Sequence, residues 1–120
     1  MAHIEHERQP AWRTKRSSLQ TRTIVSRDCG ARSLVVWEQR LQPGERIPLH
    51  YHEFEETLTV LEGELTVDIG DRQVLARARS TLFVAPGVAH KLHNRGSVPA
   101  LLLAHFINAE PTIVALPDRE

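Results

Sequence analysis

The chain has 120 residues, which is the usual size of a single domain, and its 15 basic and 15 acidic residues give a formal net charge of zero. A neutral chain has no global field to attract nucleic acid or an anionic membrane surface, so neither is expected as a partner. The single cysteine, Cys29, excludes an intrachain disulfide, and no apolar run approaches the roughly 20 residues of a membrane helix. The first residues lack a signal-peptide pattern, so we expect a cytoplasmic protein.

The amino-terminal residues 1–18 are polar and charged and show no sustained hydrophobic period. We expect an N-terminal arm that is loosely ordered unless a partner subunit binds it. His3 and His6 lie in this arm, but a mobile terminus gives ligands no fixed geometry, so no metal site is expected there. A single folded domain is expected over residues 19–116.

From Leu19 onward, short β-prone runs alternate with turns that contain glycine or proline. Strands are expected at residues 19–26, 33–41, 47–52, 57–61, 64–69, 73–76, 81–85, 88–94 and 100–107, with a final edge strand at 113–116. The runs on either side of Glu62-Gly63 predict a tight hairpin. No stretch has a helical period, so the pattern indicates an all-β sandwich or barrel.

Two histidines lie close together in the segment from Gly44 to Gly63. Side chains alternate along a strand, so His50 and His52 face the same way and Tyr51 faces the other.

A carboxylate from the next strand is expected to join these histidines. If Glu56 faces inward, so do Leu58 and Val60, and the lining is apolar. Choosing Glu55 instead would turn the threonines at 57 and 59 inward and give a less apolar lining.

A third histidine, His90, follows the Pro86-Gly87 turn and shares its face with Val88 and Leu92, whereas His93 has the opposite parity. Neutral imidazole and carboxylate are good ligands for iron, manganese, nickel or zinc. We therefore predict one divalent transition metal ion bound by His50, His52, Glu56 and His90.

The segment from Gly44 to Gly63 resembles the first signature of the cupin superfamily, Gly-x5-His-x-His-x3-Glu-x6-Gly, at every position. The second signature, Gly-x5-Pro-x-Gly-x2-His-x3-Asn, is met at Gly87, His90 and Asn94. Arg79 and Ala85 replace its leading glycine and its proline, so the turns before His90 are expected to differ in shape.

This resemblance implies a double-stranded β-helix, or jelly-roll, cupin barrel with the ion near its mouth. It also implies a homodimer, for which residues 19–27 are the expected contact. An ion with four protein ligands keeps positions open for a small organic molecule. The resemblance therefore implies a metalloenzyme with dioxygenase, decarboxylase, lyase or isomerase chemistry; the alternative is a non-catalytic ligand-binding or sensor protein.

Two further residues are candidates for catalysis. His105 is either a buried, backbone-bonded histidine or an acid or base in the pocket. Arg46 is either a solvated rim residue or a partner for a substrate carboxylate. The larger side chains on neighbouring strands, such as Trp37 and Phe106, face the pocket or not according to strand register.

Overall fold

The computed structural model describes residues 1–13, 19–108 and 111–118. Its strands are β1 (Ala11–Trp12), β2 (Gln20–Val25), β3 (Leu34–Leu41), β4 (Arg46–Tyr51), β5 (Glu56–Glu62), β6 (Glu64–Ile69), β7 (Arg72–Arg77), β8 (Ser80–Val84), β9 (His90–His93), β10 (Ala100–Ile107) and β11 (Val114–Ala115). Two single 3-10 turns, η1 (His6–Arg8) and η2 (Arg27–Cys29), are the helical elements of the described residues. No helix among these residues is long and apolar enough to cross a membrane.

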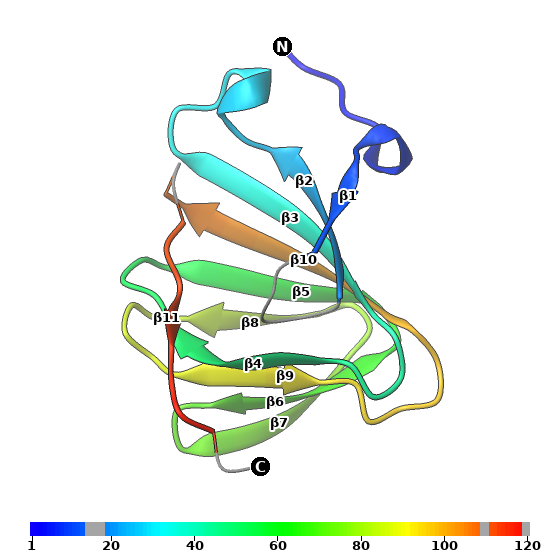
Figure 1. Cartoon of the computed structure of the whole chain (residues 1–120), viewed down its shortest axis with the longest axis vertical. Coiled ribbons are helices and arrows are strands. Elements are labelled where there is room, and N and C mark those ends of the chain that lie inside the picture. Colours follow the sequence, from blue (N-terminus) through cyan, green and yellow to red (C-terminus); the bar gives the residue numbers. More distant parts are fainter. Residues whose placement is uncertain (14–18, 109–110, 119–120) are drawn as a thin grey trace.

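The strands form two sheets whose neighbours are all antiparallel, which confirms the all-β prediction (Figure 1). One sheet has the order β1-β2-β3-β10-β5-β8, and the other has the order β11-β4-β9-β6-β7. The expected strands from residue 19 onward are all present, with ends that differ by a few residues.

The core lies between the sheets and is built by the period of two along each strand. On β5, Leu58 and Val60 are buried, and on β6 the same holds for Leu65 and Val67. Phe106 on β10 belongs to the same cluster. Apolar side chains from both sheets therefore fill the interior and surround the few polar residues that share these faces.

The predicted hairpin between residues 57–61 and 64–69 is wrong. β5 pairs with β10 and β8, whereas β6 pairs with β7 and β9, so the chain passes from one sheet to the other at Gly63. Gly63 has a φ of 73°, and a Cβ there would lie 2.6 Å from the carbonyl oxygen of Pro99. The glycine therefore marks a crossover between sheets, which lets β5 and β6 bury their apolar faces against each other's sheet.

The N-terminal arm is better ordered over its described residues than the sequence predicts. β1 pairs with β2, and the Trp12 indole N–H donates to Thr23 Oγ1 at 3.1 Å. The Trp12 ring also packs edge-on against Trp37, with centroids 5.2 Å apart. His6 Nδ1 lies 2.6 Å from Glu38 Oε2. A large apolar ring with a satisfied N–H attaches this part of the arm to the chain's own sheet; residues 14–18 lie outside the described residues.

Asn94 is fully buried and ties three segments together next to β9. Its amide donates to the carbonyl oxygens of Leu41, at 3.0 Å, and Val98, at 2.9 Å, and its oxygen accepts the Gly96 N–H at 2.9 Å. Full satisfaction of a buried amide stabilises one conformation of the chain. These bonds hold the carboxyl end of β9 beside the end of β3.

Candidate metal centre

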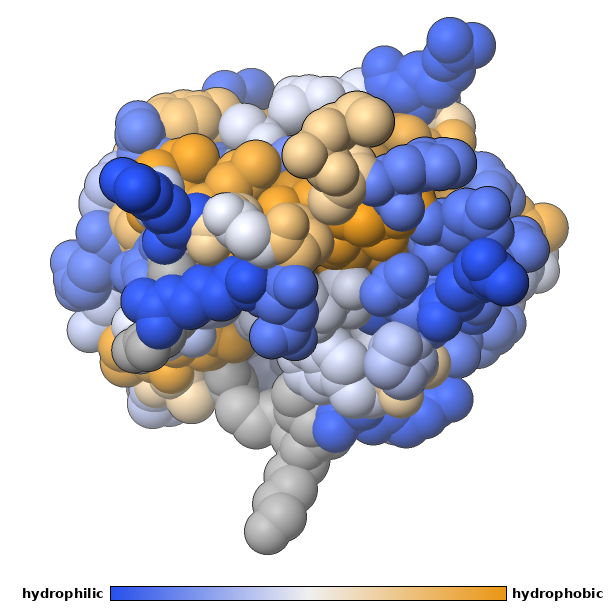
Figure 2. All heavy atoms as spheres, turned by 90° about the horizontal axis from the view of Figure 1, so that it is seen from above, coloured by the Kyte–Doolittle hydropathy of each residue, from blue (hydrophilic) through white to orange (hydrophobic). Residues whose placement is uncertain are grey.

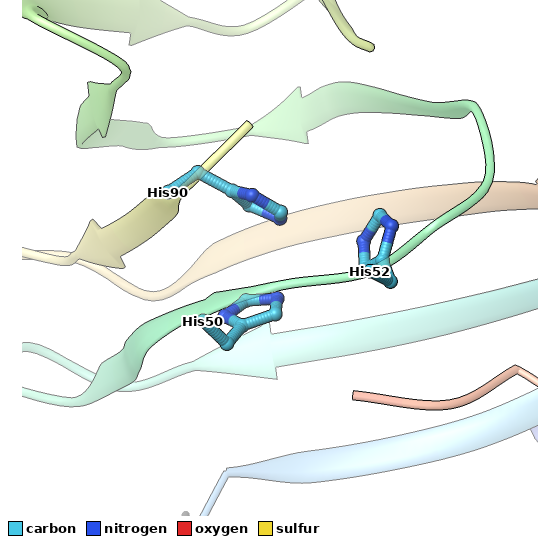
Figure 3. A group of neighbouring side chains, drawn as sticks. All are labelled: His50, His52 and His90. Atoms are coloured by element: carbon cyan, nitrogen blue, oxygen red, sulfur yellow. The ribbon is translucent and has the colours of Figure 1, made fainter. Parts of the chain in front are cut away.

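Three buried histidines meet between the two sheets. His50 lies on β4, His52 follows just past the end of β4, and His90 begins β9 directly opposite His50. Figure 3 shows their imidazole rings gathered around a common space. One ring nitrogen from each histidine lies within 4.8 Å of the others, and the three residues are 6%, 2% and 1% exposed.

Backbone carbonyl groups orient all three imidazole rings. His50 Nδ1 lies 2.7 Å from the Pro48 oxygen, His52 Nδ1 lies 3.2 Å from the Phe54 oxygen, and His90 Nδ1 lies 2.9 Å from the Val88 oxygen. A carbonyl oxygen only accepts, so each Nδ1 carries the proton and donates it. The lone pair of each neutral ring is then on Nε2, which can bind a metal ion while Nδ1 is held by the backbone.

Glu56 is the buried carboxylate of the site. It begins β5, is 4% exposed, and places Oε1 2.9 Å from His52 Nε2 and 3.2 Å from His90 Nε2. Glu55 is exposed, so the inward choice for this strand is Glu56, together with Leu58 and Val60. Two lone-pair nitrogens and an anionic oxygen converge here, and such a cluster is stable only with a cation, either a proton or a metal ion, between them.

The titration of these groups reflects the same arrangement. Burial, followed by the nearby His90 ring, lowers the pKa of His50 from 6.5 to about 4. Burial also opposes the charged form of His52, but hydrogen bonding to Glu56 and the charge of Glu56 outweigh it and raise the pKa of His52. Burial alone would raise the pKa of Glu56, yet hydrogen bonds from His52 and His90 hold it below 4.5. The carboxylate is therefore charged and His50 is neutral at pH 7, which are the forms that bind metals.

The donor set fits a divalent transition ion. It offers three imidazole nitrogens with fixed tautomers and one carboxylate oxygen, all buried, and these donors suit iron, manganese, nickel or zinc. The sequence-predicted ligands are thus brought together from β4, β5 and β9.

A cavity of about 200 Å³ opens beside these side chains. The four site residues form one part of its wall. The rest of the wall is mostly apolar and comes from Trp12, Leu19, Thr21, Trp37, Gln39, Ile47, Pro48, Leu58, Leu92, Phe106 and Ile113.

The two candidate catalytic residues lie away from this cavity. His105 pairs with Val36 and Thr57 on the outer face of its sheet, whereas its neighbour Phe106 lines the cavity. The buried Nδ1 of His105 has no hydrogen-bond partner among the described residues. Arg46 is exposed at the start of β4 and is not a lining residue. Neither residue therefore lines the cavity beside the histidines.

Among the lining residues that the sequence analysis did not place in the pocket, Trp12 is the one from the N-terminal arm. It belongs to the arm, and only its tryptophan, in an otherwise polar segment, could have indicated that the arm packs on the domain.

Comparison with known proteins matches residues 37–106 to the family model of the cupin domain. Among curated proteins, the tetracenomycin polyketide synthase protein TcmJ of Streptomyces glaucescens is 39% identical over 72 residues, covering 59% of this chain and 48% of that protein. The chain spans about half the length of the curated relatives it matches.

Solved structures share the whole fold. The polyketide cyclase RemF of Streptomyces resistomycificus superposes with a TM-score of 0.87 at 21% identity, covering 100% of this chain and 88% of that one. A predicted oxalate decarboxylase of Thermotoga maritima superposes with a TM-score of 0.81 at 21% identity, covering 89% of this chain and 99% of that one. At this identity the likeness shows the fold alone, and it confirms the expected jelly-roll barrel.

Proposed function

This chain belongs to the cupin domain family, and on that basis we propose that it is a metal-dependent enzyme acting on a small organic molecule bound beside the three histidines. The observation that carries the proposal is the orientation of His50, His52 and His90, whose Nδ1 atoms are bonded to carbonyl groups and whose Nε2 atoms are left for an ion. Together with Glu56 they are the proposed ligands of one iron, manganese, nickel or zinc ion.

Bound by these four ligands, the ion would supply a positive charge and open positions for a carbonyl or carboxylate oxygen of the substrate. The protein itself orients the ligand side chains and excludes water from the site. The carbonyl groups of residues 48, 54 and 88 fix the imidazole rings, and Glu56 balances charge without rearrangement. Leu58, Leu92 and Phe106 exclude water from the cavity wall beside it.

The names of similar proteins support two substrate classes. TcmJ and RemF are named for polyketide synthesis and cyclisation, and the structure from Thermotoga maritima is named for oxalate. The mostly apolar cavity favours a carbon-rich substrate, and the reaction would be of the dioxygenase, decarboxylase, lyase or isomerase type. The alternative is a non-catalytic protein that binds or senses the same kind of ligand, because one fold serves both uses.

We also propose that the domain spans residues 19–116 and forms a homodimer, with residues 19–27 and the outer face of the six-stranded sheet, to which β2 belongs, as its contact. Phe83 and Ile107 on this face are 57% and 62% exposed. Figure 2, which views the molecule from above, shows apolar residues gathered between hydrophilic ones on that side as well. A sheet face of this kind favours association with a second copy.

The test is elemental analysis of protein purified without added metal, followed by turnover assays. We expect one divalent ion per chain in the wild type and in His105→Ala, and loss of that ion in His52→Ala and His90→Ala. Unchanged metal content in both ligand variants would overturn the ligand assignment. Product formation or dioxygen uptake with diketones, hydroxy acids or polyketide-like aromatics would support the enzyme, whereas tight binding without turnover would support the alternative.

A further inference from the structure

The cavity has a second polar and aromatic region that is distinct from the proposed ligands. From it we infer that Trp12, Trp37 and Gln39 form a subsite for a neutral aromatic ring that carries oxygen substituents. The inference rests on the proposed function and narrows its substrate class. It also assigns part of the specificity to the N-terminal arm, which lies outside the matched family segment of residues 37–106.

Aromatic rings form a continuous wall from the arm to the histidines. Trp12 and Trp37 meet edge to face with centroids 5.2 Å apart, and Trp37 meets Phe106 in the same way at 4.9 Å. The ring centroid of Phe106 in turn lies 5.8 Å from that of His52. All four residues line the cavity. A planar ring bound here would gain edge-to-face or stacked contacts with more than one of these rings.

The indole of Trp12 is held in place before any ligand binds. Its N–H donates to Thr23 Oγ1 at 3.1 Å, and its strand pairs with β2. A ring fixed by both packing and a hydrogen bond loses little entropy on binding a ligand. The arm therefore contributes a preformed surface to the cavity.

Gln39 supplies a polar group on this mostly apolar wall. Its amide nitrogen lies 3.5 Å from Thr21 Oγ1, and this is its one hydrogen-bond partner among the described residues. A primary amide has two N–H donors and a carbonyl acceptor, so Gln39 can still donate and accept. A phenol or ketone oxygen on a bound ring would use this capacity, and a bare hydrocarbon would not.

Charge separates this class of ligand from a small dianion. Among the described lining residues there is no lysine or arginine, and Glu56 is the one carboxylate. In the metal-free protein, oxalate would therefore find no lysine or arginine on the described wall, and burial of its charge is costly without a cationic partner. A neutral ring has no such cost. The volume of the cavity is also sufficient for a single aromatic ring. Apolar cavities of about 150 Å³ accommodate benzene, and this cavity has a volume of about 200 Å³.

The experiment measures binding of 3,5-dihydroxyacetophenone and of oxalate to metal-free protein by calorimetry and by tryptophan fluorescence. Both tryptophans of the chain line the cavity, so their emission reports its occupancy. We expect the wild type to bind the phenolic ketone more tightly than oxalate. Trp12→Ala should weaken that binding about fivefold, Trp12→Phe should restore most of it, and Gln39→Leu should weaken it about fivefold.

The matched control is Leu75→Ala, an exposed position on β7 outside the cavity, which should bind like the wild type. Circular dichroism checks the fold of each variant; if Trp12→Ala is unfolded, Trp12→Phe and Gln39→Leu decide the question. No binding to the wild type, tighter binding of oxalate, or affinities within twofold for the folded variants would overturn the subsite. Metal content is measured separately, so failure of the subsite is distinguishable from failure of the metal site.

Discussion

The Nε2 atom of His52 lies 2.9 Å from Oε1 of Glu56, and both side chains are buried. Because His52 Nδ1 donates to the Phe54 carbonyl, a neutral His52 would point a lone pair at a carboxylate. A cation between the two groups removes this conflict, whether it is a proton or a metal ion. The charge on Glu56 therefore controls how strongly the site attracts a cation.

Glu56→Gln keeps the size of the side chain and removes this charge. We expect the affinity for a divalent ion, measured by chelator competition, to fall by at least about tenfold. The exposed neighbour Glu55 provides the control, since Glu55→Gln should leave the affinity unchanged. Equal losses in the two variants would show that Glu55, or general surface charge, contributes to the site.

The metal-free protein should lose stability in acid because of His50. The pKa of His50 is 6.5 in an ordinary setting and about 4 in the fold. Between these two values, His50 is protonated in the unfolded chain and neutral in the folded one. The free energy of unfolding should fall between pH 6.5 and 4, by up to roughly 3 kcal/mol from this group.

Two neighbours of His50 also make stability depend on pH, each in a different range. The lowered pKa of Glu56 adds to the acid loss below pH 4.5, whereas the raised pKa of His52 gives stability that is complete below pH 6.5 and lost as the pH rises through its folded value. Urea denaturation at pH 6.5 and 4.5 measures the effect, and His50→Gln should flatten it. An equally steep fall in that variant would assign the acid sensitivity to other groups.

The crossover at Gly63 should tolerate no side chain. Gly63→Ala places a Cβ 2.6 Å from the Pro99 oxygen in addition to the strain of a positive φ. Gly44→Ala has a comparable φ of 88° but nothing within 4 Å, so it should cost only about 1 kcal/mol. We expect Gly63→Ala to lower the free energy of unfolding by at least about 2 kcal/mol more than the control. Similar values for both would mean that the backbone shifts freely at the crossover.

Asn94→Ala should be strongly destabilising because it leaves backbone groups of Leu41, Val98 and Gly96 without the partner that the buried Asn94 side chain provides. A loss of roughly 3 kcal/mol in chemical denaturation is expected. Gln73→Ala removes an exposed hydrogen bond, 2.8 Å long, from the Gln73 amide to Asp68 Oδ1. This loss should lower the free energy of unfolding by less than about 1 kcal/mol. A small loss at Asn94 would indicate that water replaces its bonds.

Ile107→Lys should dissociate the proposed homodimer, because it replaces an exposed apolar side chain on the outer face of the six-stranded sheet by a charged one. Sedimentation velocity would then show a monomer for this variant and a dimer for the wild type. Leu75→Lys, on the other sheet and 48% exposed, should remain a dimer. A dimer that persists in Ile107→Lys would place the interface elsewhere.

Local sequence patterns were sufficient for most of the strands and for the proposed ligands. Alternation along a strand is a property of the backbone itself, so it correctly placed His50 and His52 on one face and preferred Glu56 to Glu55. The same rule placed His90 with the buried Leu92. These predictions needed only the period of two and the contrast between apolar and polar residues.

Tertiary structure decided what depends on pairing between distant segments. β-propensity on both sides of Gly63 is the same for a hairpin and for a crossover, and only burial against two different sheets selects the crossover. Strand register turned Phe106 into the cavity and His105 out of it. Trp12 became part of the cavity because β1 pairs with β2, a contact between strands that a short polar arm does not encode in its own period.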